Sequence, residues 1–364
     1  MRTVSRTLTA GALLLALALV AGACGEDTAD TTTTTAAEAT TTTSDGGGGE
    51  TTTTAGEATT TTVAGPITDV PVTVGFASAD QPAYAPATLG IENAERVPME
   101  AIFFQQSELS LQALLQGEVD VLAIGVNGPM IAVNEGAELV IIGVTIGNDW
   151  TLVTTSDIET PADLAGTTIA IHSETSTGTP LVRGTLDDAG VEAEFVIIPG
   201  SPNRAQAMTQ GQIDATPLFL SGAIELEIAD PDRFRVLLDY GEVPFASQAI
   251  VTTRSWLEEN PEIAQALVEH FIQIGRRIAA EPQWAVDQLS DRFPDDDPAY
   301  LDRLVAEYVD RGLWVTDGGA ELLSNFGGAI EINIALGTLP ADALSEVEDY
   351  VDRTALDMAL ANLE

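Results

Sequence analysis

The chain has 364 residues, enough for two lobes with their own cores. Its 14 basic residues, all arginine, face 56 acidic ones, for a formal net charge of −42. Such a surface repels phosphate backbones and anionic lipid, which argues against nucleic-acid binding and against membrane attachment through a basic patch. The chain has a single cysteine, so an internal disulfide or a zinc site built from cysteines is excluded.

The first residues have the pattern of an export signal. Arg2 and Arg6 precede an apolar run, residues 10–20, which ends in Ala-Gly-Ala before Cys24. A basic start, a short apolar stretch and small residues before a cleavage site are typical of secretory signals. The run is shorter than the roughly 20 residues that span a bilayer. We therefore expect residues 1–23 to be a removed signal peptide.

Cys24 directly follows this pattern and resembles the modified cysteine in the lipobox of bacterial lipoproteins. The resemblance implies that Cys24 carries lipid and anchors the protein to the outer face of the cytoplasmic membrane. Two acyl chains on one cysteine give stable anchoring, where one is marginal. Ala21 departs from the leucine or valine of the lipobox, and an ordinary signal peptidase that cuts at the same bond would leave a free thiol. Both outcomes stay open.

Residues 24–66 consist mainly of Thr, Ala, Gly and Glu, with threonine runs of four and five and one run of four glycines. This composition cannot bury a core. We expect a disordered tether whose ends lie roughly 35–40 Å apart on average. Such a tether holds a domain near a membrane and lets it turn.

From residue 70 onwards, short β-rich runs alternate with helical runs in two series. The first series predicts strands at residues 70–76, 99–104, 119–124, 138–144 and 150–155, and helices at 109–116 and 129–135. The second predicts strands at residues 167–172, 193–199, 234–240 and 247–253, and helices at 161–166, 180–189 and 204–210. After residue 255 the chain is mostly helical. Strands that alternate with helices predict parallel α/β sheets.

A nine-residue pattern occurs once in each series. Residues 112–120 are QALLQGEVD and residues 206–214 are QAMTQGQID. In both copies a predicted helix ends at glycine, and an aspartate leads into a predicted strand. This order is common in α/β proteins, so the pair alone gives modest support. Together with the surrounding alternation it favours two related lobes, with the pattern as a structural step in each.

Five stretches carry a family resemblance: QALLQGEVDVLAIG (112–125), IETPADLAGTTIAIH (158–172), AMTQGQIDATPL (207–218), RSWLEENPEIAQAL (254–267) and YVDRTALDMAL (350–360). In this order they resemble the substrate-binding proteins of bacterial nitrate-, sulfonate- and taurine-type ABC importers, including relatives that bind thiamine precursors. Residues 89–106 depart from the family, because they lack its usual Gly-Tyr-Phe segment. The resemblance implies two doubly wound α/β lobes joined by two hinge crossings, with a ligand cleft between them, as in type II periplasmic binding proteins.

On this resemblance we assign residues 67–155 and 248–364 to the first lobe and residues 156–247 to the second. The crossings are expected near Thr151–Ser156 and Ser247–Thr252, and the late helices are expected to return to the first lobe. Ligands bind beyond the carboxyl ends of parallel strands. The loops that follow the predicted strands are therefore where we expect the ligand contacts.

Four such loops are residues 77–84, 105–108, 126–130 and 173–180. In the fourth, SETSTGTP, hydroxyls, a glycine and a proline at a helix start can surround an oxyanion at the positive end of the helix dipole. Ordinary helix capping is an equal alternative for any single Ser or Thr there. The predicted substrate-binding residues are Ser78, Asp80, Tyr84, Ser107, Asn127, Gly128, Trp150, Ser173, Glu174, Thr175, Ser176, Thr177, Pro217 and Leu218.

Three of the polar and aromatic candidates have two interpretations each. Glu174 suits an amine or amide on the ligand, unless it points to solvent. Trp150 stacks on a planar ligand or packs at the hinge. Arg204 could bind an anion, but we interpret it as an exposed arginine at a helix start.

The sequence gives little indication that the protein is an enzyme. His172 and His270 are the only histidines, and no spacing indicates a metal site or a phosphate-binding loop. A related fold makes the thiamine pyrimidine with a cysteine cluster, which this chain lacks. We expect no catalytic residue, metal or cofactor. The ATP-driven step then belongs to a partner protein.

The expected function is that of a monomeric extracytoplasmic solute-binding protein for an ABC permease and its cytoplasmic ATPase. The ligand is a small polar or anionic molecule, either sulfonate-, nitrate- or taurine-like or a pyrimidine precursor of thiamine. Two alternatives stay open. One is a surface receptor of the same fold that senses without transport, and the other is a secreted enzyme that uses His172 and Glu174.

Overall fold

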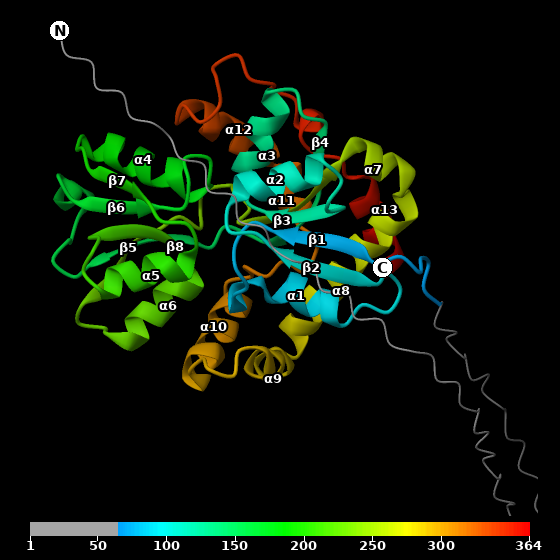
Figure 1. Cartoon of the computed structure of the whole chain (residues 1–364), viewed down its shortest axis with the longest axis horizontal. Coiled ribbons are helices and arrows are strands. Elements are labelled where there is room, and N and C mark those ends of the chain that lie inside the picture. The colour runs from blue at the N-terminus through cyan, green and yellow to red at the C-terminus, as the bar shows by residue number, and fades with distance from the viewer. Residues whose placement is uncertain (1–64) are drawn as a thin grey trace, which may run out of the picture. The chain divides into compact units, whose positions relative to one another are not determined.

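The computed structural model describes residues 65–364 (Figure 1). The predicted signal peptide, the lipid attachment at Cys24 and nearly all of the predicted tether lie outside the described residues. Within residues 65–364, no helix combines the length and the apolar character that a membrane crossing needs.

The described chain forms two five-stranded sheets. The first sheet has the order β2 (Met99–Phe103), β1 (Val72–Phe76), β3 (Val121–Ile124), β10 (Gln248–Thr253) and β4 (Leu139–Ile146). The second has the order β7 (Glu194–Ile197), β6 (Thr168–Ile171), β8 (Ala215–Phe219), β5 (Trp150–Thr155) and β9 (Phe234–Asp239). In each sheet the first three strands are parallel, and the fourth is antiparallel to both of its neighbours.

Helices cover both faces of each sheet. They are α1 (Ala85–Glu92), α2 (Ser107–Leu115), α3 (Asn127–Asn134), α4 (Gly178–Ala189), α5 (Ser201–Thr209), α6 (Leu220–Ala229), α7 (Arg254–Glu259), α8 (Pro261–Ala280), α9 (Pro282–Arg292), α10 (Pro298–Asp310), α11 (Ala320–Ser324), α12 (Phe326–Ala335) and α13 (Thr354–Leu363). Figure 1 shows α4 on one face of the second sheet and α5 and α6 on the other. The predicted class, two doubly wound α/β lobes, is confirmed, although each sheet is mixed rather than wholly parallel.

The crossings between the sheets differ from those expected. Strand β5 pairs with β8 and β9 of the second sheet, so the chain leaves the first sheet at residues 147–149, before Trp150. It returns at residues 240–247, and β10 pairs with β3 and β4. The predicted placement of residues 150–155 in the first lobe was wrong, because the run predicts a buried strand without predicting its partner. We therefore propose lobe boundaries within these two segments.

The late helices return to the first sheet. Helix α8 packs against α1, β4 and α13, and Trp314 forms an isolated bridge with Ile146 of β4. The indole N–H of Trp314 donates to the carbonyl oxygen of Ala83 at 2.9 Å. Helix α10 contacts α6 of the second sheet as well. The late helices therefore pack against the first sheet and against a helix of the second, on both sides of the two crossings.

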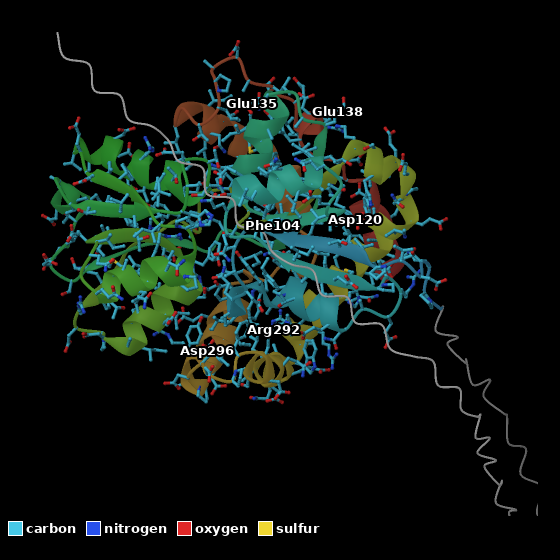
Figure 2. The ribbon with its side chains drawn as sticks, in the orientation of Figure 1. Phe104, Asp120, Glu135, Glu138, Arg292 and Asp296 are labelled. Carbon is cyan, nitrogen blue, oxygen red and sulfur yellow. The ribbon has the colours of Figure 1, made fainter. Side chains whose placement is uncertain are left out.

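The nine-residue pattern forms the same structure twice. The Asp120 carboxylate accepts the Thr73 N–H at 2.7 Å, and the Asp120 N–H donates to the Thr73 carbonyl oxygen at 3.0 Å. In the second copy, Asp214 makes the same two bonds to Thr168, at 2.8 and 2.9 Å. Each aspartate therefore holds the start of its sheet's central parallel strand. Figure 2 shows Asp120 at the end of the first sheet that lies away from the second.

Replacing Asp214 with alanine should lower the free energy of unfolding by about 1–3 kcal/mol, because the Thr168 N–H loses its side-chain acceptor. Asp214→Asn keeps an acceptor oxygen and should cost less. Urea unfolding measures both variants, and the affinity for ligand should stay within about twofold. Unchanged stability with lost binding would contradict the structural role of the pattern.

Candidate functional site

A cavity of about 50 Å³ lies where loops from the two sheets meet. Its lining residues are Ala77, Ser78, Tyr84, Ser107, Ala123, Ile124, Gly125, Gly128, Trp150, His172, Thr175, Ser176, Thr177, Ser201, Arg204, Phe219, Ser247 and Gln248. All six parallel strands, β1 to β3 and β6 to β8, contribute residues at or just beyond their carboxyl ends. This is the edge at which α/β sheets bind ligands. The volume suits a head group of a few atoms.

Eight of the predicted residues line this cavity: Ser78, Tyr84, Ser107, Gly128, Trp150, Thr175, Ser176 and Thr177. They come from all four predicted loops and from the start of β5. The structure thus brings together groups that lie up to about 100 positions apart in the sequence. Their role in binding a ligand stays a prediction.

The structure places two predicted acidic residues elsewhere. The Asp80 carboxylate accepts at 2.7 Å from Arg292 of α9, which is labelled in Figure 2. The Glu174 carboxylate pairs with Arg183 at 2.6 Å on the surface. Glu174 therefore points to solvent, which was one of its two interpretations. Arg292 is remote in sequence from Asp80, and Arg183 lies on the helix that follows Glu174. The loop sequences alone therefore did not indicate these partners.

Four other predicted residues also lie outside the cavity lining. Pro217 and Leu218 are interior residues of β8, because this strand continues to Phe219, which reaches the cavity instead. Asn127 is fully buried at the start of α3. The Ser173 carbonyl oxygen accepts from the side chains of Ser176 and Thr179, so Ser173 holds the loop in shape.

Trp150 both packs at the crossing and lines the cavity. Its ring packs against that of Phe219, with centroids 4.5 Å apart. A Cβ added at Gly178 would lie 2.8 Å from Cζ3 of Trp150, so a glycine is required where the six-membered ring meets the start of α4. The indole N–H, at the opposite edge of the ring system, has no hydrogen-bond partner among the described residues.

Arg204 is the main cavity residue that our prediction missed. It lies in the first turn of α5 and is fully buried, so its assignment as an exposed arginine was wrong. Its guanidinium donates to Thr216 Oγ1, Ser201 Oγ and the carbonyl oxygens of Ile198 and Pro217, at 3.1 to 3.2 Å. These four acceptors are uncharged.

No carboxylate among residues 65–364 lies within ion-pairing distance of Arg204. Burial lowers the pKa of Arg204 to about 10, so the group stays charged at neutral pH. A buried charge without a partner is costly, and proteins keep one where it meets an opposite charge. The charge of Arg204 therefore favours an anion in this cavity, even though the chain as a whole is strongly acidic.

Two more N–H donors of the cavity belong to His172 and Gln248, which were not among the predicted contacts. The His172 Nε2 and Gln248 Nε2 atoms are buried and have no hydrogen-bond partner among the described residues. Burial and the nearby Arg204 charge lower the pKa of His172 to about 4, so its ring is neutral at pH 7. His172 ends a quoted family stretch, which was the available signal for it.

Asp149 connects the cavity wall to both crossings. Its carboxylate accepts from the Tyr308 hydroxyl at 2.5 Å, and its N–H donates to Ser247 Oγ at 3.2 Å. Its carbonyl oxygen accepts the Leu220 N–H at 2.8 Å. Burial raises the pKa of Asp149 to about 6, and the hydrogen bonds from Ser247 and Tyr308 oppose this rise.

Asp149→Asn should raise the free energy of unfolding at pH 7. A pKa raised from 3.8 to about 6 means that folding favours the protonated acid, and this corresponds to about 3 kcal/mol. The stability that protonated Asp149 contributes is fully present below about pH 4 and is lost as the pH rises through 6. The free energy of unfolding of Asp149→Asn should therefore exceed that of the natural protein by up to about 3 kcal/mol at pH 7 and match it near pH 4. Urea unfolding at several pH values measures the difference, and a less stable variant at pH 7 would contradict the assignment.

Within the described part of the chain, no group of three or more His, Cys, Asp or Glu side chains is placed to hold a metal ion. The cavity residues offer N–H and hydroxyl groups and one guanidinium. Such a set binds an anion through hydrogen bonds and charge.

A protein family described as NMT1/THI5 like matches residues 96–283, just over half of the chain. The chain belongs to the NMT1/THI5-like family. This confirms the family resemblance of the sequence. No curated protein sequence matches the chain.

Solved structures show the same fold. The alkanesulfonate-binding protein SsuA from Xanthomonas axonopodis pv. citri, bound to MOPS, is 20% identical, with a TM-score of 0.64 over 80% of this chain and 99% of that one. The periplasmic nitrate-binding protein NrtA from Synechocystis PCC 6803 is 14% identical, with a TM-score of 0.68 over 81% and 89%. The aliphatic sulphonate binding protein SsuA from Escherichia coli is 18% identical, with a TM-score of 0.60 over 78% and 92%. At these identities the likeness establishes the periplasmic binding protein fold.

Proposed function

We propose that this NMT1/THI5-like protein is an extracytoplasmic solute-binding protein that captures a small oxyanion between its lobes for an ABC importer. The observation that carries the proposal is Arg204, a buried arginine on the cavity wall with no carboxylate partner among the described residues. Its guanidinium is held in place by four neutral acceptors. A ligand anion supplies the charge that the protein does not.

The same cavity distinguishes the ligand classes that the sequence left open. A pyrimidine precursor of thiamine carries an amino group, which needs an acceptor such as a carboxylate. The cavity lining contains no Asp or Glu among the described residues. The sulfonate and nitrate groups of the ligands named for the solved neighbours present only acceptor oxygens, which fits the N–H and hydroxyl lining. We therefore favour a sulfonate or a similar small oxyanion over a pyrimidine.

The proposal includes the transport partners and the site of action. Lobes that close on a ligand would present it to a membrane permease with a cytoplasmic ATPase, and closure is a hinge motion whose populations the ligand shifts. A signal peptide, a lipid on Cys24 and the Thr-rich tether would keep a monomeric receptor at the outer face of the membrane. The protein itself needs no catalytic residue, metal or cofactor for this role.

Thermal unfolding of the purified mature protein tests the proposal. We expect methanesulfonate, taurine or nitrate to raise the midpoint temperature, because a ligand at 100 times its Kd stabilises by about 2.7 kcal/mol. Small-angle scattering should show compaction with the same ligand. Stabilisation by a hydroxymethylpyrimidine and by none of the anions would overturn the oxyanion assignment.

A further inference from the structure

His172 has a fixed tautomer. Its Nδ1 atom accepts the backbone N–H of Gly200 at 3.0 Å. A backbone N–H can only donate, so the proton of the neutral ring is on Nε2. His172 lines the cavity with 6% of its surface exposed, and Nε2 has no partner among the described residues. The ring thus presents a donor to the cavity.

The side chains of Gln248 and Trp150 also present N–H donors to the cavity. Gln248 Oε1 accepts from the Thr145 hydroxyl at 2.7 Å, which leaves its NH₂ group for the cavity. The indole of Trp150 has a donor and no acceptor. Each of these side chains has 5% or less of its surface exposed. Gln248 can offer an acceptor only by breaking its bond to Thr145, and Trp150 can offer none.

The Ser201 hydroxyl of the cavity lining is oriented by its neighbour. Ser201 Oγ accepts from the Arg204 guanidinium at 3.1 Å, so its own proton is free to point at a ligand. Ser247 Oγ accepts the Asp149 N–H, and its hydroxyl also bonds to the Asp149 carboxylate. The carboxylate of Glu108 accepts from Thr175 Oγ1 at 2.5 Å and is not part of the cavity lining.

The geometry points to His172 as a specificity-determining residue, which admits anionic groups that carry no proton and rejects those that keep one. This rests on the proposed function, the capture of an oxyanion beside Arg204. A sulfonate has three acceptor oxygens and no proton at neutral pH. A phosphonate or phosphate monoanion keeps an O–H, and the Nε2–H of His172 gives this proton no acceptor. The hydroxyl oxygens of the lining, such as Ser78 Oγ, are the acceptors that are left for it. An unpaired buried donor lowers affinity by roughly tenfold or more.

The charged groups near His172 leave its ring neutral over the pH range of the test. Arg204 lowers the pKa of His172 and Glu108 opposes this, and burial has the largest effect, so the pKa lies at about 4. The ring therefore does not titrate between pH 6 and pH 9. Asp149, which bonds to Ser247 of the lining, has a pKa of about 6 and becomes charged over this range, but its charge acts on both anions. A change in the preference between the two anions then comes from the proton on the ligand.

Calorimetric titration with methanesulfonate and methylphosphonate, two anions of similar size, tests the inference. Methanesulfonate carries the same charge from pH 6 to pH 9, so its affinity at each pH is the reference for the effect of the protein's own titration. Methylphosphonate should bind at least about tenfold more weakly at pH 6, where it keeps a proton, and the gap should narrow as the proton leaves. Equal binding of both anions at pH 6 overturns the inference and leaves the proposed function standing. Failure of both anions to bind overturns the proposed function and this inference with it.

A variant separates the role of His172 from a structural one. His172→Gln puts an amide near the position of Nε2, and its carbonyl oxygen can turn to accept the proton of the phosphonate. The preference for methanesulfonate at pH 6 should fall by roughly tenfold in this variant. His270→Gln is the control, because His270 bonds to the Gly90 carbonyl oxygen outside the cavity lining. An unchanged preference in His172→Gln, or a ¹⁵N spectrum of the natural protein with the proton on Nδ1, overturns the inference.

Discussion

Replacing Arg204 with methionine is expected to weaken the binding of methanesulfonate by at least about 30-fold. Removing one partner of a buried, hydrogen-bonded charge pair costs about 2–5 kcal/mol, and Arg204 is the only charged side chain in the cavity lining among the described residues. Isothermal titration calorimetry at pH 7 measures the loss. The loss should appear in the affinity for every small oxyanion, because the charge acts on all of them.

Two further variants control this result. Arg204→Lys keeps the charge without the planar fork, so its affinity should lie between those of the natural protein and Arg204→Met. Arg183→Met removes another arginine of the second lobe, which pairs with Glu174 and lies over the Phe195 ring. The affinity of Arg183→Met for methanesulfonate should stay within about twofold of that of the natural protein. Circular dichroism confirms that each variant is folded, and binding by folded Arg204→Met within threefold of the natural affinity would contradict the role of Arg204.

The alternation of strands and helices was sufficient to predict the fold class, because the periodicity of buried strands is local in sequence. The strand partners were not predictable in this way. Residues 150–155 form a buried strand in either sheet, and only the complete set of hydrogen bonds assigns β5 to the second sheet. The repeated pattern helped, because an aspartate after a helix and a glycine marks the same position in each lobe.

The candidate site was predictable where the loops themselves carry the polar groups. The hydroxyls of residues 175–177 lie in one such loop and line the cavity. Asp80 and Glu174 were misplaced because a loop sequence does not reveal which charges are neutralised. The Asp80 partner, Arg292, is 212 residues away. Arg204 was missed for the opposite reason, since its burial depends on the packing of α5 against β8.

One signal could have identified Arg204 from the sequence. It follows residues 199–203, PGSPN, in which Pro199 and Gly200 connect a strand to helix α5 and a serine and a proline begin the helix. The fourth predicted loop, residues 173–180, has the same character in the same lobe. Loops after neighbouring parallel strands meet at one sheet edge. An arginine in the first turn beyond such a loop, in a chain with few basic residues, is placed to meet an anion.

Gly125→Val is expected to weaken ligand binding by about 10- to 100-fold while each lobe stays folded. Gly125 follows β3 in the first lobe, and a Cβ there would overlap Thr177 Oγ1 in the second. Overpacking at such a contact costs about 1–3 kcal/mol. The backbone of Gly125 is outside the left-handed region, so the effect is steric. Calorimetry measures the affinity, and small-angle scattering should show less compaction with ligand than in the natural protein.

A double-mutant cycle tests whether the contact between the lobes is the cause. Gly125→Ala alone should weaken binding, because its Cβ meets the Thr177 hydroxyl. Adding Thr177→Ala removes that oxygen and leaves the two Cβ atoms 3.5 Å apart, an ordinary contact. Gly125→Ala should therefore cost less affinity in the Thr177→Ala background than in the natural one, with a coupling of about 0.5–3 kcal/mol. Additive losses would place the effect of Gly125 within its own lobe, and closure of the cleft would then not depend on this contact.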